Sequence, residues 1–176
     1  MTDRVRIVVM GVSGSGKSLV GREVAARLGL PFFDADDFHS AGNVAKMRDG
    51  TPLDDADRSE WLDALARLIE DREGMVLACS ALKRSYRDRL RAADPDIAFL
   101  YLAGDYDTIR ARMSARNGHY FGGDAMLRSQ FETLEAPPVT EAARIDVAQE
   151  PEAVVAACLA HLQDLRSRPR GAGLSS

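Results

Sequence analysis

Residues 11–18 read Gly11-Val12-Ser13-Gly14-Ser15-Gly16-Lys17-Ser18 and match the pattern G-x-x-x-x-G-K-[ST] at every position. An apolar run at 5–10 precedes them, and a segment with helical periodicity at 19–28 follows and ends at Gly29. This order predicts a buried strand, a glycine-rich turn and the start of a helix. Such a turn directs backbone amides toward an anion, and the helix N-terminus adds its positive dipole end. We therefore expect this stretch to bind a nucleoside triphosphate.

The residue types in this stretch suggest separate roles. Lys17 can reach the β and γ phosphates of the triphosphate, and the Ser18 hydroxyl can ligate Mg²⁺. A chance Gly/Ser turn followed by a lysine is the alternative, and the matching flanks disfavour it. The residues that we expect to bind the nucleotide here are Gly11, Ser13, Gly14, Ser15, Gly16, Lys17 and Ser18.

The composition is that of one globular domain. The chain has 176 residues, of which 45% are hydrophobic, which is enough to bury a core. A net charge of −4 gives no reason to expect binding to nucleic acid or to a membrane surface. No apolar run approaches the ~20 residues of a bilayer span, and no signal peptide precedes the first strand, so we expect a cytoplasmic protein. Cys79 and Cys158 lie in apolar segments and are expected to be buried thiols.

Strand-like and helical segments alternate along the chain. This alternation predicts an α/β protein with a five-stranded parallel sheet and helices on both faces. The expected strands are 5–10, 31–34, 75–79, 97–102 and 144–148. We expect a single domain over 1–165 with two inserts, one at 36–73 that binds substrate and one at 112–124 that forms a lid, followed by a disordered tail at 166–176.

Carboxylates follow the second expected strand, where ligands bind in parallel sheets. If 33–36 stays extended, Asp34 and Asp36 share one face and Asp37 points away. This placement suggests magnesium coordination and proton abstraction, with Asp34 and Asp36 as the candidates. The alternative is that these acids cap a helix, which is the interpretation that we favour for Asp37.

The segment after the third strand reads Cys79-Ser80-Ala81-Leu82-Lys83. Many phosphate-loop enzymes have a metal-supporting Asp near this point, so its absence moves that role toward Asp34. Ser80 can contact a substrate or cap the helix expected at 83–93. The start of that helix carries the positive charges of Lys83, Arg84 and Arg87, which the helix dipole disfavours and an anionic ligand would offset. For Arg84, a side chain that simply faces solvent explains the sequence equally well.

The two inserts carry further candidate residues. In the first, Arg58 can pair with a substrate carboxylate, and Trp61 either lines the same pocket or belongs to the core. In the second, arginines flank a glycine hinge, which is typical of loops that close over a transferred phosphoryl group. We expect Arg116 or Arg112 to make that contact.

Taken together, these motifs resemble the thermoresistant gluconokinase family over about residues 5–160. The resemblance rests on 10–18, Asp34-Ala35-Asp36, His39, Asn43, Lys46-Met47, Gly50, Pro52-Leu53, Asp57-Arg58, Trp61-Leu62, 79–83, Tyr86-Arg87-Asp88, Gly118-His119 and 130–135. The chain departs from the family pattern at 40–42, where family members often carry arginines, and at 120–122.

This resemblance implies a nucleoside-monophosphate-kinase-like fold, ATP-dependent phosphorylation of D-gluconate on its 6-hydroxyl, a requirement for Mg²⁺ and, commonly, a homodimer. In this interpretation Lys17, Asp36 and Arg116 are the catalytic residues, and Ser18 and Asp34 serve the metal. The expected substrate-binding residues are Asp36, His39, Asn43, Arg58, Ser80, Lys83, Arg87 and His119.

Two other functions fit parts of the sequence. A kinase for shikimate or another small polyhydroxy acid would also carry an Asp-x-Asp after the second strand. A nucleotide-switch NTPase would explain Asp71-Arg72-Glu73-Gly74, which spells D-x-x-G. That segment, however, precedes the third strand, and the sequence has no Asn-Lys-x-Asp motif to read guanine.

Overall fold

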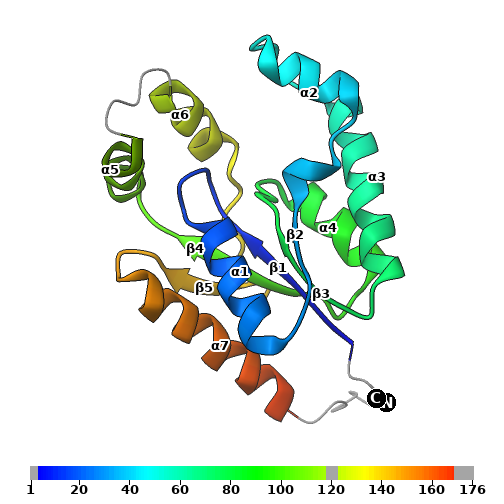
Figure 1. The fold of residues 1–176 in the computed structure, drawn as a ribbon, viewed down its shortest axis with the longest axis vertical. Helices are drawn as coiled ribbons and strands as arrows, with labels where there is room; N and C mark the ends of the chain where they lie inside the picture. The colour runs from blue at the N-terminus through cyan, green and yellow to red at the C-terminus, as the bar shows by residue number, and fades with distance from the viewer. Residues whose placement is uncertain (1–3, 118–122, 169–176) are drawn as a thin grey trace.

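Five parallel strands form one sheet in the order β2-β3-β1-β4-β5 (Figure 1). The computed structural model describes residues 4–117 and 123–168. The strands are β1 (Val5–Met10), β2 (Phe32–Asp34), β3 (Gly74–Ala78), β4 (Ala98–Ala103) and β5 (Ala143–Asp146). The prediction of a five-stranded parallel sheet is confirmed, with strand ends that differ from the expected ones by one or two residues.

Helices cover both faces of this sheet. They are α1 (Lys17–Leu28), a 3₁₀ turn η1 (Ala35–Phe38), α2 (Ala41–Arg48), α3 (Asp55–Asp71), α4 (Arg84–Ala93), α5 (Tyr106–Asn117), α6 (Gly123–Thr133) and α7 (Pro151–Ser167). Helices α1 and α7 pack together on one face, and α3 packs with α4 on the other. Helix α7 continues through Arg166 and Ser167, where the sequence predicted the start of a tail; the rest of that predicted tail, 169–176, lies outside the described residues.

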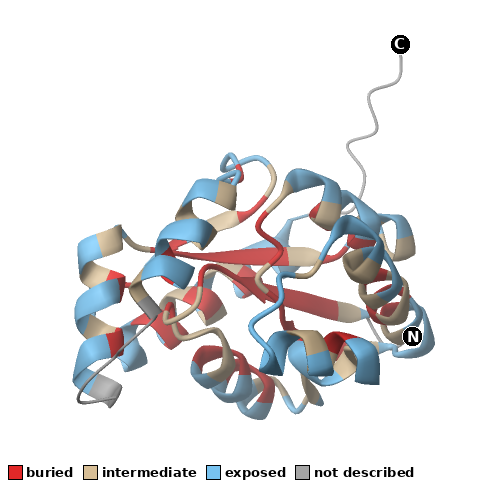
Figure 2. Ribbon diagram, turned by 90° about the horizontal axis from the view of Figure 1, so that it is seen from above, coloured by how far each residue is buried: buried red, intermediate tan, exposed pale blue. Residues whose placement is uncertain are grey.

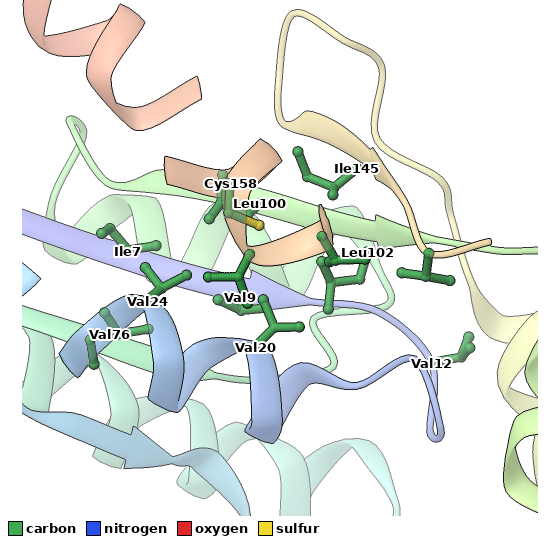
Figure 3. Packing of buried hydrophobic residues seen from close by; sticks show 14 of the residues in the cluster. Ile7, Val9, Val12, Val20, Val24, Val76, Leu100, Leu102, Ile145 and Cys158 are labelled. Atoms are coloured by element: carbon green, nitrogen blue, oxygen red, sulfur yellow. The ribbon is translucent and has the colours of Figure 1, made fainter. Parts of the chain in front are cut away.

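The two hydrophobic cores follow from the alternation of side chains along the central strand. Ile7 and Val9 of β1 point toward α1 and α7, whereas Val8 and Met10 point toward α3 and α4. Figure 2 shows that buried residues concentrate on the central strands, and Figure 3 shows α1 packed over β1. Strand β1 is buried on both faces, which is why most of 5–10 is hydrophobic. Its one charged residue, Arg6, is 7% exposed and pairs with Asp94 at 3.1 Å.

Both cysteines are buried and unpaired, as predicted. Burial raises the pKa of each thiol to about 12, so neither is a reactive thiolate near neutral pH. Within the described ranges, no helix is both long and apolar enough to cross a bilayer.

The carboxyl ends of the strands meet at one edge of the sheet. The loop between β1 and α1 crosses this edge, with η1 and α2 on one side and the α5–α6 pair on the other (Figure 1). Ligands bind at this edge in parallel sheets, so the fold brings the predicted site residues of β1, β2 and β3 together.

Candidate active site

The loop 11–16 has the backbone shape of a phosphate-binding turn. Gly14 and Gly16 have φ of 79° and 93°, in the left-handed region that side chains other than glycine rarely adopt. A Cβ at Gly14 would also lie 2.4 Å from Cγ of Met113, so the loop passes close against α5. Helix α1 starts at Lys17 without a side-chain cap, which leaves the amides of its first turn available for an anion.

Lys17 lies over this loop among acidic groups. Its Nζ donates a hydrogen bond to the carbonyl oxygen of Val12 at 3.0 Å. Burial lowers the pKa of Lys17, while the carboxylates of Asp36 and Asp34 are near enough to oppose that change. The two acids and the lysine predicted to act together therefore do meet at the end of the sheet.

Ser18 and Asp34 form a pair of oxygen ligands beside the loop. The Ser18 hydroxyl donates to Oδ2 of Asp34 at 3.0 Å. No cluster of three or more His, Cys, Asp or Glu side chains suited to a metal occurs in the described ranges. One hydroxyl and one carboxylate fit Mg²⁺, which is usually held by one or two protein oxygens, substrate phosphates and water.

The acidic segment after β2 folds differently from the extended form that the sequence suggested. The strand ends at Asp34, whose Oδ1 accepts the Asp36 amide at 3.0 Å and caps the 3₁₀ turn η1. The cap is thus Asp34 and not Asp37, because the side chain just before the turn can reach its unpaired amide. Partial burial of its carboxyl is the main cause that raises the pKa of Asp36, followed by the negative charge of Asp34.

An aromatic wall stands next to Asp36. The rings of His39 and Trp61 stack with centroids 4.6 Å apart and an interplanar angle of 11°. Trp61 also donates from Nε1 to the carbonyl oxygen of Ala35 at 2.7 Å, so it ties α3 to η1. Burial lowers the pKa of His39, which favours the neutral imidazole. Trp61 was not among the predicted site residues, because an aromatic on an apolar helix stripe usually belongs to the core.

Asn43 serves as a link within the first insert. Its side chain is 3% exposed, and Nδ2 donates to the carbonyl oxygen of Asp57 at 3.1 Å and lies 3.4 Å from Nδ1 of His39. These contacts join α2 to α3 behind His39. They indicate that Asn43 shapes the pocket wall in this structure.

Three other predicted substrate residues border the same region. Arg58 is half-buried on α3, and its charge contributes to the lowered pKa of His39. Ser80 follows β3, and its carbonyl oxygen accepts the Gly11 amide at 3.3 Å, which joins this segment to the phosphate loop. The proposed cap by Ser80 is wrong: α4 begins later, and Lys83 occupies the N-cap position.

Arg87 is not placed to bind a substrate, which corrects the prediction for this residue. Its side chain is 1% exposed, and Nε donates to Oε1 of Glu141 at 2.6 Å. The other guanidinium nitrogens donate to the carbonyl oxygens of Ala81, Leu82 and Glu135. The sequence suggested an anion-binding cluster because Arg87 lies near a helix start, but the fold turns it inward, where protein oxygens take up its donors.

The nucleotide side of the loop has a small pocket that includes an expected arginine. Arg112 of α5 donates to the carbonyl oxygen of Gln149 at 2.8 Å and thereby closes one side of it. Arg116 lies in the last turn of α5, but its side chain falls outside the described part of the chain, as does His119. The pocket is lined by Gly14, Ser15, Gly16, Leu19, Val20, Arg112, Pro151 and Val154.

One residue that contacts the phosphate loop was missing from the predicted site. Gln130 of α6 forms two side-chain hydrogen bonds with Ser13. Gln130 is the first residue of the segment 130–135, which contributed to the family resemblance. No local pattern, however, indicates that its side chain contacts a loop 117 positions away in the sequence.

A phosphate loop, an acidic pair and a small pocket beside the loop, on a five-stranded parallel sheet, define a small-molecule kinase of the P-loop class. The family model described as shikimate kinase matches residues 13–163. The thermosensitive gluconokinase of Escherichia coli K12 is 49% identical, with 80% of this chain and 78% of that protein covered. The thermoresistant gluconokinase of the same organism is 47% identical, with 86% and 90% covered.

A solved structure gives the same result. The crystal structure of a gluconokinase from Sinorhizobium meliloti 1021 has a TM-score of 0.83 and 41% identity, and it covers 96% of this chain and 100% of that one. The chain belongs to the gluconokinase family, within the broader group of kinases that the shikimate kinase model describes.

The buried position of Arg87 leads to a stability prediction. Burial acts to raise the pKa of Glu141, but hydrogen bonds from Arg87 and Arg91 prevail and lower it, so this carboxylate is ionised in the folded state. Glu141→Gln leaves the Arg87 guanidinium buried without its counter-charge and should reduce the free energy of unfolding by about 3 kcal/mol in urea titrations.

Asp88→Asn is the matched control for this measurement. Asp88 also contacts Arg91, at 2.9 Å, but its side chain is 57% exposed. This change should cost less than about 1 kcal/mol, because solvent screens an exposed ion pair. Equal losses for the two variants would contradict the structural role given to Arg87.

Proposed function

We propose that this protein transfers the γ-phosphoryl group of ATP to the 6-hydroxyl of D-gluconate and forms 6-phospho-D-gluconate. The observation that carries the proposal is the position of Asp36. Its carboxyl lies within electrostatic reach of Lys17 and next to the Ser18–Asp34 pair, so an acceptor hydroxyl held there would face the end of the triphosphate.

The nucleotide half of the site is built mainly from backbone. The amides of the loop and of the first turn of α1 hold the phosphates, and Lys17 exchanges its contact with Val12 for phosphate oxygens. Ser18 and Asp34 would hold Mg²⁺, Asp34 through water. The ion neutralises charge on the β and γ oxygens when it is bound. Arg112 and Pro151 border the pocket that receives the base.

The part of the site that receives the acceptor hydroxyl supplies a proton acceptor, Asp36, and an aromatic wall, His39 and Trp61, that orients the substrate. Phosphoryl transfer requires mostly alignment and charge stabilisation, so the protein has to fix the hydroxyl in line with the γ-phosphate. Asp36 accepts the hydroxyl proton as the new O–P bond forms and the bond to the β–γ bridging oxygen breaks. Burial raises its pKa, which makes it a stronger base than an ordinary aspartate.

Substrate recognition combines charge with hydrogen bonding. We assign the gluconate carboxylate to Arg58 and Lys83. The sequence predicted three arginine or lysine residues at the substrate, Arg58, Lys83 and Arg87, and these two are the ones whose charge is not bound inside the protein. The neutral His39, held flat against Trp61, and Ser80 contact the hydroxyls. Arg116 and His119, whose side chains lie outside the described part of the chain, remain predicted contributors.

Relatives favour gluconate over shikimate as the substrate. The curated relatives with 47–49% identity are named gluconokinases, whereas the match to the shikimate kinase model defines only the broader group. From the same resemblance we also expect a homodimer and a dependence on Mg²⁺, and from the sequence a cytoplasmic protein. Sedimentation analysis and EDTA titration test the first two.

A substrate panel tests the proposed function. With Mg-ATP and coupled detection of ADP, gluconate should support turnover with a kcat/KM at least about 100-fold above that for shikimate or nucleoside monophosphates. ATP consumption that is independent of any sugar acid would instead point to a nucleotide switch. Preference for shikimate would overturn the assignment of the acceptor.

Asp36→Asn tests the role of the proton acceptor. The amide keeps the size of the side chain but cannot take up a proton, so kcat should fall by about 10²–10⁴-fold while Mg-ATP still binds. Asp37→Asn, a neighbouring exposed acid in the same turn, should keep kcat within about twofold of the wild type at pH 8. Near-normal turnover by Asp36→Asn would remove Asp36 from the mechanism.

A further inference from the structure

Gln130 makes a two-point contact with the phosphate loop. The Ser13 amide donates to Oε1 of Gln130 at 2.6 Å, and Nε2 of Gln130 donates to the Ser13 hydroxyl oxygen at 2.9 Å. A backbone amide can only donate, so the orientation of the glutamine amide is fixed by its partner. One half-buried side chain makes both hydrogen bonds. Together they fix the position of the Ser13 backbone and the orientation of its hydroxyl group.

Because the Ser13 amide donates to Gln130, it is not one of the loop amides that can bind a phosphate. Ser13 stands immediately before Gly14, the point at which the loop also touches Met113 of α5. The tip of the loop is therefore held by α6 on one side and by α5 on the other. Of the amides after Ser13, that of Ser15 donates to the carbonyl oxygen of Val12 at 3.2 Å. The triphosphate therefore depends on the other amides after Ser13, and their direction depends on where Ser13 is held.

Helix α6 is itself anchored on the acceptor side of the site. The amide of Glu135, just beyond the helix, donates to the carbonyl oxygen of Leu82 at 2.8 Å, and Arg87 donates to the carbonyl oxygen of Glu135 at 2.9 Å. Leu82 belongs to the same segment as Ser80 and Lys83, which we assign to gluconate. Gln130 lies in the last turn of α6 and Glu135 just beyond it, so hydrogen bonds at the two ends of this segment connect the phosphate loop with the acceptor segment.

We infer that Gln130 is a positioning residue that sets the distance and angle between the γ-phosphoryl group and the acceptor hydroxyl. This inference rests on the proposed phosphoryl transfer. Gln130 does not touch a reacting atom. It holds the phosphate loop in register with the segment after β3, and misplacement of reactants by about 1 Å can cost on the order of 100-fold in rate.

Gln130→Ala and Gln130→Glu separate this role from a purely structural one. Alanine removes both hydrogen bonds, so kcat should fall by about 10- to 100-fold with little change in the KM for gluconate. Glutamate has the same length and can accept from both the Ser13 amide and the Ser13 hydroxyl, so the contact is kept. Its negative charge beside the phosphates should instead raise the KM for ATP by about tenfold, while kcat stays within about threefold of the wild type.

Ser13→Ala removes only the hydroxyl half of the contact and should lower kcat by about three- to tenfold. The double variant Ser13→Ala/Gln130→Ala should match Gln130→Ala within about twofold, because the hydroxyl acts through Gln130. Ser129→Ala, an exposed neighbour on the same helix, should behave like the wild type.

The wild-type protein in the same assay separates this inference from the proposed function. If wild-type enzyme does not phosphorylate gluconate, the proposed function fails. If it does, a folded Gln130→Ala variant with kcat within twofold of the wild type overturns the role of Gln130, and so do independent, multiplying effects of the two single changes. If Gln130→Ala does not fold, Ser13→Ala decides: an unchanged kcat in that variant overturns the role of Gln130.

Discussion

The structure is organised around the need to hold a highly charged triphosphate with uncharged backbone groups. Such binding requires several amides to point into one concave turn, without carbonyl partners of their own. Glycines with positive φ make the turn, and an uncapped helix start supplies further donors. Because the turn leaves β1 at the edge of the sheet, every other functional group has to reach that edge, and the parallel sheet brings the ends of β2 and β3 there.

Around this anion site, charged groups of two kinds serve different ends. Lys17 and Asp36 lie at the open edge of the sheet, where a ligand can meet them. Burial lowers the pKa of Lys17 and raises the pKa of Asp36, and the charge of each residue opposes the shift of the other. Arg87 carries the same charge as Lys17 but lies in the interior, bonded to Glu141 and to backbone oxygens. It fixes the loop of which Ala81, with a φ of 46°, is part. The residues proposed to contact substrate, Ser80 and Lys83, and the structural residue Arg87 thus lie within one short segment of sequence.

The sequence predicted the parts of the molecule that depend on local patterns. The motif at 11–18 with its flanks was sufficient for the strand, the loop and α1, and the alternation of segments was sufficient for the five-stranded sheet. It did not predict the inward turn of Arg87, because the partners that decide it, Glu135 and Glu141, lie about 50 residues away. The same holds for Gln130, whose contact with Ser13 joins distant segments. The 3₁₀ turn after β2 was missed for a different reason: Asp34 can either continue a strand or cap a turn, and only its hydrogen bond to the Asp36 amide decides between them.

A crystal structure with Mg-ADP, aluminium fluoride and gluconate tests the central claim directly, because aluminium fluoride takes the place of the phosphoryl group in transfer. The account predicts the 6-hydroxyl of gluconate at about 3 Å from the Asp36 carboxylate and in line with the leaving oxygen of ADP, with the Ser18 hydroxyl on the metal. A 6-hydroxyl that points away from Asp36, or one that another side chain accepts from, would contradict it.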